Sequence, residues 1–235
     1  MGEIAEAFRL AFDLLFSMDA ELFAIVFLSL KVSLIAVAIA CLLGFAIGSA
    51  VAIFSFPGRR AIVILLNALM GLPPVVVGLL VYLMLSRSGP LGVLGLLYTP
   101  TAMIIAQVVL ITPLVAALSS HLLKDLHTEY DEFFRSLNLG RRAKMKAILW
   151  DGRSGLITVA LVGFGRAISE VGAVMIVGGN INHLTRIMTT AIALETSKGT
   201  LALALALGII LVSISIIINA SVMMVRSSAE GHAHD

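Results

Sequence analysis

Long apolar runs separated by short polar stretches dominate the chain from residue 22 onwards. A run of about 20 apolar residues is long enough to cross the hydrocarbon core of a bilayer as a helix. Before the first run, residues 1–21 alternate apolar and charged positions with helical spacing, which is typical of a helix lying in the membrane interface. The pattern predicts an all-α integral membrane protein with an N-terminal interfacial helix. We expect five spans, at residues 32–54, 61–85, 101–123, 155–177 and 201–225.

The second apolar run carries a strong helix breaker. Pro73 and Pro74 follow Gly71 and Leu72, and two successive prolines remove two backbone donors and oppose helical geometry. We therefore expect a kink or break at mid-membrane depth. Such a break either exposes backbone groups beside a pathway or only bends the span around a neighbour.

A charged segment, residues 124–153, interrupts the apolar pattern and holds twelve of the thirty Lys, Arg, Asp and Glu residues. Seven of these are basic, and short basic loops are retained on the cytoplasmic side. Five spans then place the N-terminus outside and the C-terminus inside. The expected organisation is one membrane domain, residues 22–226, with a cytoplasmic loop at about 124–154 and a disordered cytoplasmic tail, residues 227–235. Between the fourth and fifth spans, we expect an external segment with a short, partly inserted helix.

Composition agrees with a membrane protein, because 60% of residues are hydrophobic, 13% are charged and the mean hydropathy is +1.07. The net charge of +2 does not indicate nucleic-acid binding, since the basic residues flank the apolar runs, where topology accounts for them. No Gly-x-x-x-x-Gly-Lys-Ser/Thr phosphate loop occurs in the sequence, so we do not expect this chain to hydrolyse ATP. No catalytic or metal-binding constellation stands out either.

The charged segment contains Glu132-Phe133-Phe134, then Asn138 and Gly140, and Ile148 further on. These residues resemble the EAA loop of binding-protein-dependent ABC importer permeases, whose pattern is Glu-Ala-Ala, three residues, Gly, nine residues, then Ile-x-Leu-Pro. Glu132 and Ile148 match this pattern. The departures are Phe133 and Phe134 for the two alanines, Asn138 for the glycine unless Gly140 replaces it, and Trp150-Asp151 for Leu-Pro.

A second motif lies in the fourth run. Residues 165–173, Gly-Arg-Ala-Ile-Ser-Glu-Val-Gly-Ala, followed by Gly-Gly-Asn-Ile at 178–181, resemble the Arg-Ala-Leu-Gly-Glu-Phe-Gly-Ala…Gly-Asn segment of molybdate and sulfate permeases. The form that this motif takes at residues 165–181, together with residues 188–199, is most similar to the corresponding segments of tungstate permeases. Residues 72–78, Leu-Pro-Pro-Val-Val-Val-Gly, fit the same group. The resemblance extends over residues 31–219.

This resemblance implies a type I ABC importer transmembrane-domain fold and import of an oxyanion, with tungstate expected first and molybdate or sulfate as alternatives. It also implies two cytoplasmic ATPase subunits that bind the Glu132 loop, and an extracytoplasmic binding protein. ATP and magnesium would be held by the ATPase, with no cofactor on this chain. A single five-span protomer encloses little space, so a homodimer would complete the pathway. The expected location is the cytoplasmic (inner) membrane of a prokaryote.

Several residues have both a functional and a structural interpretation. Phe133 and Phe134 could anchor a helix in a groove of an ATPase, or fold back onto this chain. Arg166 and Glu170 are four apart, so on a helix they could pair, either as a structural clamp or beside the pathway. Asn180 could offer donors at the outer mouth or follow an ordinary helix end.

Two other function classes remain open at the level of the residues. In an ion-coupled secondary transporter, Arg166 and Glu170 would form the coupling site, although no internal repeat is evident in the sequence. In a membrane-embedded enzyme, Glu170 would act as acid or base beside His183. Neither class explains why residues 132–148 fit an ATPase-coupling loop.

Overall fold

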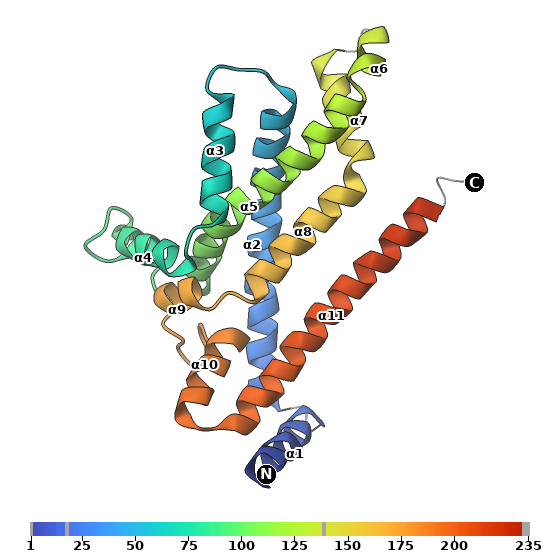
Figure 1. Cartoon of the computed structure of the whole chain (residues 1–235). Helices are drawn as coiled ribbons and strands as arrows, with labels where there is room; N and C mark the ends of the chain where they lie inside the picture. Colours follow the sequence, from blue (N-terminus) through green and yellow to red (C-terminus); the bar gives the residue numbers. More distant parts are fainter. Residues whose placement is uncertain (1, 17–18, 138–139, 232–235) are drawn as a thin grey trace.

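The computed structural model describes residues 2–16, 19–137 and 140–231, and within these ranges the regular secondary structure is helical (Figure 1). The elements are α1 (Gly2–Phe16), α2 (Ala20–Ile53), α3 (Arg59–Met70), α4 (Pro74–Leu85), the 3-10 turn η1 (Gly92–Leu94), α5 (Pro100–Glu129), α6 (Asp131–Ser136), α7 (Arg141–Asp151), α8 (Arg153–Ile168), α9 (Gly172–Gly178), α10 (Met188–Lys198) and α11 (Leu201–Gly231).

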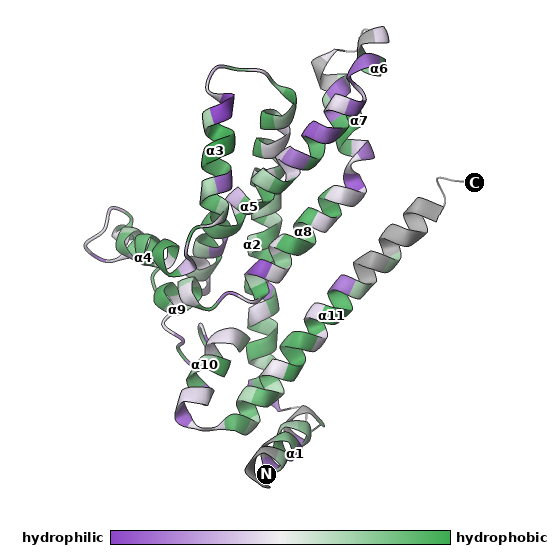
Figure 2. Cartoon of the chain, viewed as in Figure 1, coloured by the Kyte–Doolittle hydropathy of each residue, from purple (hydrophilic) through white to green (hydrophobic). Residues whose placement is uncertain are grey.

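The structure has three to five candidate membrane spans, against the five expected from the sequence. By length and apolar composition, α2, α5 and residues Leu201–Ala220 of α11 can each cross a bilayer. Two bent pairs bring the total to as many as five: α3 with α4, which meet at 101°, and the last part of α7 with α8, which meet at 66°. Figure 2 shows apolar residues along the long helices and polar ones gathered around α6 and α7.

Three boundaries differ from those expected. α2 begins at Ala20 because the Asp19 carboxylate accepts a hydrogen bond from the Leu22 N–H (2.9 Å), which caps the helix well before residue 32. The fourth span, expected to be continuous over 155–177, is interrupted, since α8 ends at Ile168 and α9 begins at Gly172. α11 continues to Gly231, past residue 226, where the membrane domain was expected to end.

The centre of the fold is the long parallel pair α2 and α5, which make the most extensive helix contact. Gly44 and Gly48 lie four apart on α2, and small residues at this spacing let helix backbones approach closely. A Cβ added at Gly44 would lie 2.8 Å from Cβ of Val115 on α5. The absence of side chains at these positions therefore sets the distance between the two helices.

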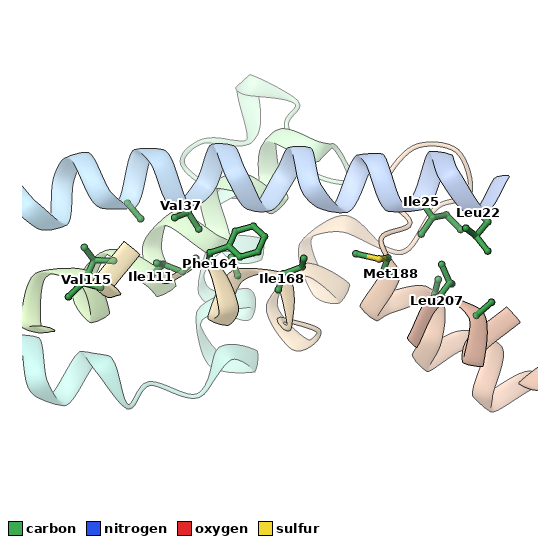
Figure 3. Close-up of a cluster of buried hydrophobic side chains, with 14 of the residues drawn as sticks. Leu22, Ile25, Val37, Ile111, Val115, Phe164, Ile168, Met188 and Leu207 are labelled. Carbon is green, nitrogen blue, oxygen red and sulfur yellow. The ribbon is translucent and has the colours of Figure 1, made fainter. Parts of the chain in front are cut away.

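A hydrophobic core joins this pair to the helices on one side of it. Buried residues of α2, α5, α8, α10 and α11 meet in a single cluster, including Val37, Ile111, Phe164 and Met188 (Figure 3). α1 packs against α11. The position of α1 in a membrane interface stays a prediction.

Candidate functional site

The strongest break in the chain lies between α3 and α4, where the sequence predicts it. α3 ends at Met70, Pro73 is extended (φ −62°, ψ 124°), and Pro74 takes the first position of α4, where its missing N–H costs no helical hydrogen bond. The two helices meet at 101°, so Pro73 and Pro74 form a corner rather than a mild kink. The expected break is confirmed, and its depth in a membrane stays a prediction.

An open cavity of about 550 Å³ lies against this corner. Liquid water occupies only ~30 Å³ per molecule, so the cavity has room for a hydrated small ion. Its other wall comes from α5 and from the last turns of α8. The cavity is lined by Met70, Gly71, Leu72, Pro73, Pro74, Leu114, Val162, Gly165, Arg166 and Ser169. The structure thus brings Pro73, Pro74 and Arg166 together, although more than 90 residues separate the prolines from the arginine in the sequence.

Arg166 supplies the positive charge of this cavity. Its side chain is exposed, and within the described residues no carboxylate forms an ion pair with it. Arg166 lies in the last turn of α8, where the partial negative charge of the helix end favours a cation. The Ser169 hydroxyl beside it donates to the Gly165 carbonyl (2.7 Å). The cavity therefore presents one unpaired guanidinium on an otherwise mostly apolar wall.

Glu170 does not pair with Arg166, and the expected i,i+4 contact is wrong because α8 ends at Ile168, before Glu170. The Glu170 side chain is instead buried, and its carboxylate accepts a hydrogen bond from the Ala173 N–H (3.1 Å) in the first turn of α9. Its backbone carbonyl accepts from the Thr189 hydroxyl (2.8 Å) on α10. In this structure, Glu170 holds the break between α8 and α9 and anchors α10.

Gln107 of α5 supports the same break, and it is not among the residues expected from the sequence. Its side chain is fully buried, and its Nε2 donates to the Ala167 carbonyl (3.0 Å) at the end of α8. Its Oε1 has no hydrogen-bond partner among the described residues. A lone amide in an apolar run was the signal that could have found it, because buried amides in membrane helices are costly without a partner.

Asn180 lies apart from the cavity. α9 ends at Gly178 and is capped by Gly179, whose backbone is left-handed (φ 69°), and Asn180 continues in the left-handed region (φ 50°). The Asn180 amide donates to the Thr190 carbonyl of α10 (3.3 Å). This contact joins the end of α9 to α10 and favours the structural interpretation of Asn180.

The charged loop forms a helical hairpin beyond the end of α5. Phe134 of α6 is 4% exposed and packs in one cluster with Ala52, Leu123, Ile148 and Leu156, which come from α2, α5, α7 and α8. Phe133, its neighbour, is 59% exposed. Each interpretation therefore applies to one of the two residues. Phe134 folds back onto this chain, and Phe133 stays available to a partner.

The other predicted loop residues lie on the outer part of this hairpin. Glu132 is exposed in the first turn of α6, and Gly140 is the exposed residue that precedes α7. Asn138 lies outside the described residues. Glu132 and Phe133 thus form an exposed polar and apolar pair at the tip of the loop.

Contacts at the base of the hairpin fix it to α7. The Tyr130 hydroxyl donates to the Asp151 carboxylate (2.7 Å), and this hydrogen bond, with the negative charge of Asp151, raises the pKa of Tyr130. The Lys144 ammonium lies 5.9 Å from the centre of the Phe134 ring. These contacts couple α5, α6 and α7, so that α6 has a defined orientation.

In the described part of the chain, no group of three or more His, Cys, Asp or Glu side chains is placed to hold a metal ion. His183, at φ 58° in the segment between α9 and α10, is exposed.

Comparison with known proteins fits this geometry. Residues 40–228 match the family described as the inner membrane component of binding-protein-dependent transport systems. The chain belongs to this family. The match includes the corner, the cavity and the charged hairpin, so each of these features lies within the family's own domain and none is an addition to it.

Individual relatives are similar over most of their length. The tungstate uptake system permease protein TupB of Peptoclostridium acidaminophilum is 45% identical over 85% of this chain and 87% of its own. TupB of Campylobacter jejuni is 37% identical over 85% of this chain and 83% of its own. The sulfate transport system permease protein CysW of Escherichia coli is 27% identical over 75% of this chain and 63% of its own.

Family membership and the apolar helices make the chain a multi-pass inner membrane protein that works with a binding protein. The type I ABC importer fold expected from the sequence is confirmed on the same grounds.

Proposed function

We propose that this chain is the membrane-spanning permease subunit of an ABC importer for an oxyanion, with tungstate as its substrate. The observation that carries the proposal is the similarity to two tungstate permeases over 85% of the chain, at 45% and 37% identity. A sulfate permease is more distant, at 27% identity over 75% of the chain. Molybdate and sulfate are the alternative substrates.

The anion passes the cavity at the α3–α4 corner. Arg166 offers a positive charge there, and the N-terminal end of α4 adds a partial positive charge. One exposed guanidinium on an apolar wall suits brief passage of a dianion rather than tight binding, which needs several converging donors. Selection between tungstate, molybdate and sulfate then belongs mainly to the binding protein.

The exposed tip of the hairpin docks on a cytoplasmic ATPase. Phe133 is the apolar anchor and Glu132 the charged contact, while Phe134 links α6 to α5, α7 and α8 through their shared cluster. α8 begins beside the hairpin and carries Arg166 in its last turn, so a displacement of α6 reaches the cavity through one helix. ATP and magnesium are bound by the ATPase, two copies of which serve a homodimer of this chain.

The rival function is an ion-coupled secondary transporter, and reconstituted transport separates the two. The complex of this chain, its ATPase and its binding protein is purified, and its mass is checked for two copies of permease and ATPase. In proteoliposomes, we expect tungstate uptake that needs ATP and persists when ion gradients are collapsed. Uptake that follows an ion gradient without ATP would establish the rival.

A single substitution tests the coupling loop within this assay. Glu132→Ala should leave the complex assembled but lower tungstate uptake per ATP hydrolysed at least several-fold, because the contact that transmits nucleotide binding is lost. Glu129→Ala is the matched control, since it removes an exposed carboxylate at the end of α5, outside α6. Equal coupling ratios in the two variants would remove Glu132 from the proposed mechanism without affecting the ATP requirement of transport.

A further inference from the structure

A second cavity, of about 240 Å³, lies where the C-terminal end of α2 meets the start of α3 and the later part of α5. It is separate from the cavity at the α3–α4 corner and shares no lining residue with it. It is lined by Val51, Ala52, Arg59, Arg60, Val63, Ser120, His121 and Lys124. Three residues with a fixed positive charge therefore converge on one hollow, and no acidic residue lines it.

The three cations differ in what they already contact. Arg59 is part of the wall: its Nε donates to the Val51 carbonyl (2.7 Å) and its guanidinium also donates to the Ala52 carbonyl (3.0 Å), covering the last turn of α2. Arg60 and Lys124 have exposed side chains and, within the described residues, form no ion pair. The unpaired positive charge of the pocket is thus supplied by two exposed side chains, Arg60 and Lys124, while Arg59 is held by hydrogen bonds to the end of α2.

The uncharged part of the lining is largely apolar, from Val51, Ala52 and Val63. Beyond the pocket, α3 carries exposed apolar side chains in the direction of the corner: Ile62, Ile64 and Leu65 are 37%, 61% and 54% exposed. A ligand with an anionic head and long apolar chains would match both parts. A free oxyanion would match only the charged part.

We propose that this pocket binds the phosphate headgroup of an anionic phospholipid, whose acyl chains lie along the exposed face of α3. Arg and Lys donate charge-assisted hydrogen bonds to phosphate oxygens, and basic residues at the end of a membrane helix attract anionic lipid. The bound lipid would hold the α2–α3 connection against α5. This role is independent of which substrate the importer carries.

Native mass spectrometry of the full chain, purified in detergent and titrated with phosphatidylglycerol, tests the pocket. Arg60→Gln with Lys124→Gln should weaken one tight binding event about 30-fold, because each basic residue at a membrane surface contributes about 5-fold. Lys31→Gln with Arg87→Gln removes the same charge from exposed positions outside the pocket and should change that event less than about 2-fold. Arg60→Lys with Lys124→Arg should preserve binding.

Three results would overturn the proposal. The first is equal phosphatidylglycerol affinity in the pocket variant and the control. The second is phosphatidylcholine binding as tightly as phosphatidylglycerol. The third is one-for-one displacement of the lipid by millimolar inorganic phosphate or tungstate, which would make the pocket a site for soluble oxyanions. If the double variant is not recovered, Lys124→Gln alone decides the question through its expected loss of about 5-fold.

Discussion

Phe133 and Phe134 are adjacent in the chain, yet one is 59% and the other 4% exposed. Truncating Phe134 leaves a cavity among Leu123, Ile148 and Leu156, and core Phe→Ala substitutions typically lower the free energy of unfolding by about 3 kcal/mol or more. We expect Phe134→Ala to lower the thermal unfolding temperature of the detergent-purified chain. Phe133→Ala should leave that temperature nearly unchanged and reduce the amount of ATPase that co-purifies. A comparable loss of stability in both variants would show that Phe133 is also part of the fold.

For single residues, the sequence predicts where a motif lies better than it predicts which side chains are buried or paired. The spacing of Glu132 and Ile148 located the hairpin, and Ile148 is indeed fully buried in it. The orientation of the two phenylalanines depends on Leu123, Ala52 and Leu156, which come from distant parts of the chain. The predicted Arg166–Glu170 contact is wrong for a related reason. The hydrogen bond from Thr189 to the Glu170 carbonyl favours a helix break that the neighbouring residues do not predict.

Among the elements, α4 and α9 approach each other closely at Gly78. A Cβ at Gly78 would lie 2.7 Å from Cα of Ala173, and that backbone atom can move only if the helices separate. Gly78→Ala should therefore destabilise the chain by about 1–3 kcal/mol, as overpacking generally does. Transport should fall with it, since α4 begins at the corner that lines the cavity.

Gly208→Ala is the matched control for this prediction. A Cβ at Gly208 meets no atom within 4 Å, and alanine is favoured over glycine inside a helix by about 0.5–1 kcal/mol. Thermal unfolding of the two variants should therefore shift in opposite directions. A Gly78→Ala protein as stable as the parent would mean that the α4–α9 contact yields more easily than its geometry indicates.

The two helix breaks differ in how far local sequence determines them. Pro73 and Pro74 dictate a break directly, although not its angle of 101°, which depends on how α4 packs against α9. The break after Ile168 has no proline. It is held by tertiary hydrogen bonds, from Gln107 to the Ala167 carbonyl and from Thr189 to the Glu170 carbonyl. The apolar composition of residues 155–177 predicted a continuous span, because Gln107 and Thr189, which hold the break, lie outside that segment.

On the scale of the whole molecule, the orientation in the membrane follows from where the cations lie. Seven basic residues lie between 124 and 153, while the segment between α9 and α11 carries only Arg186 and Lys198. Basic residues are retained on the cytoplasmic side, so α6 should face the cytoplasm and the end of α10 the outside. In a Cys41→Ala background, Ser136→Cys and Ser197→Cys each place one thiol at an exposed position on α6 or α10.

A membrane-impermeant maleimide added to intact cells should label the Ser197→Cys protein and leave the Ser136→Cys protein unlabelled. In inside-out vesicles, the pattern should reverse, because the same two positions exchange access to the reagent. Labelling after detergent lysis measures the total reactive thiol and corrects for local differences in reactivity. The opposite pattern would put the hairpin outside the cell, where no ATP-hydrolysing subunit could reach Glu132 and Phe133. The orientation is thus the physical condition on which the proposed coupling mechanism depends.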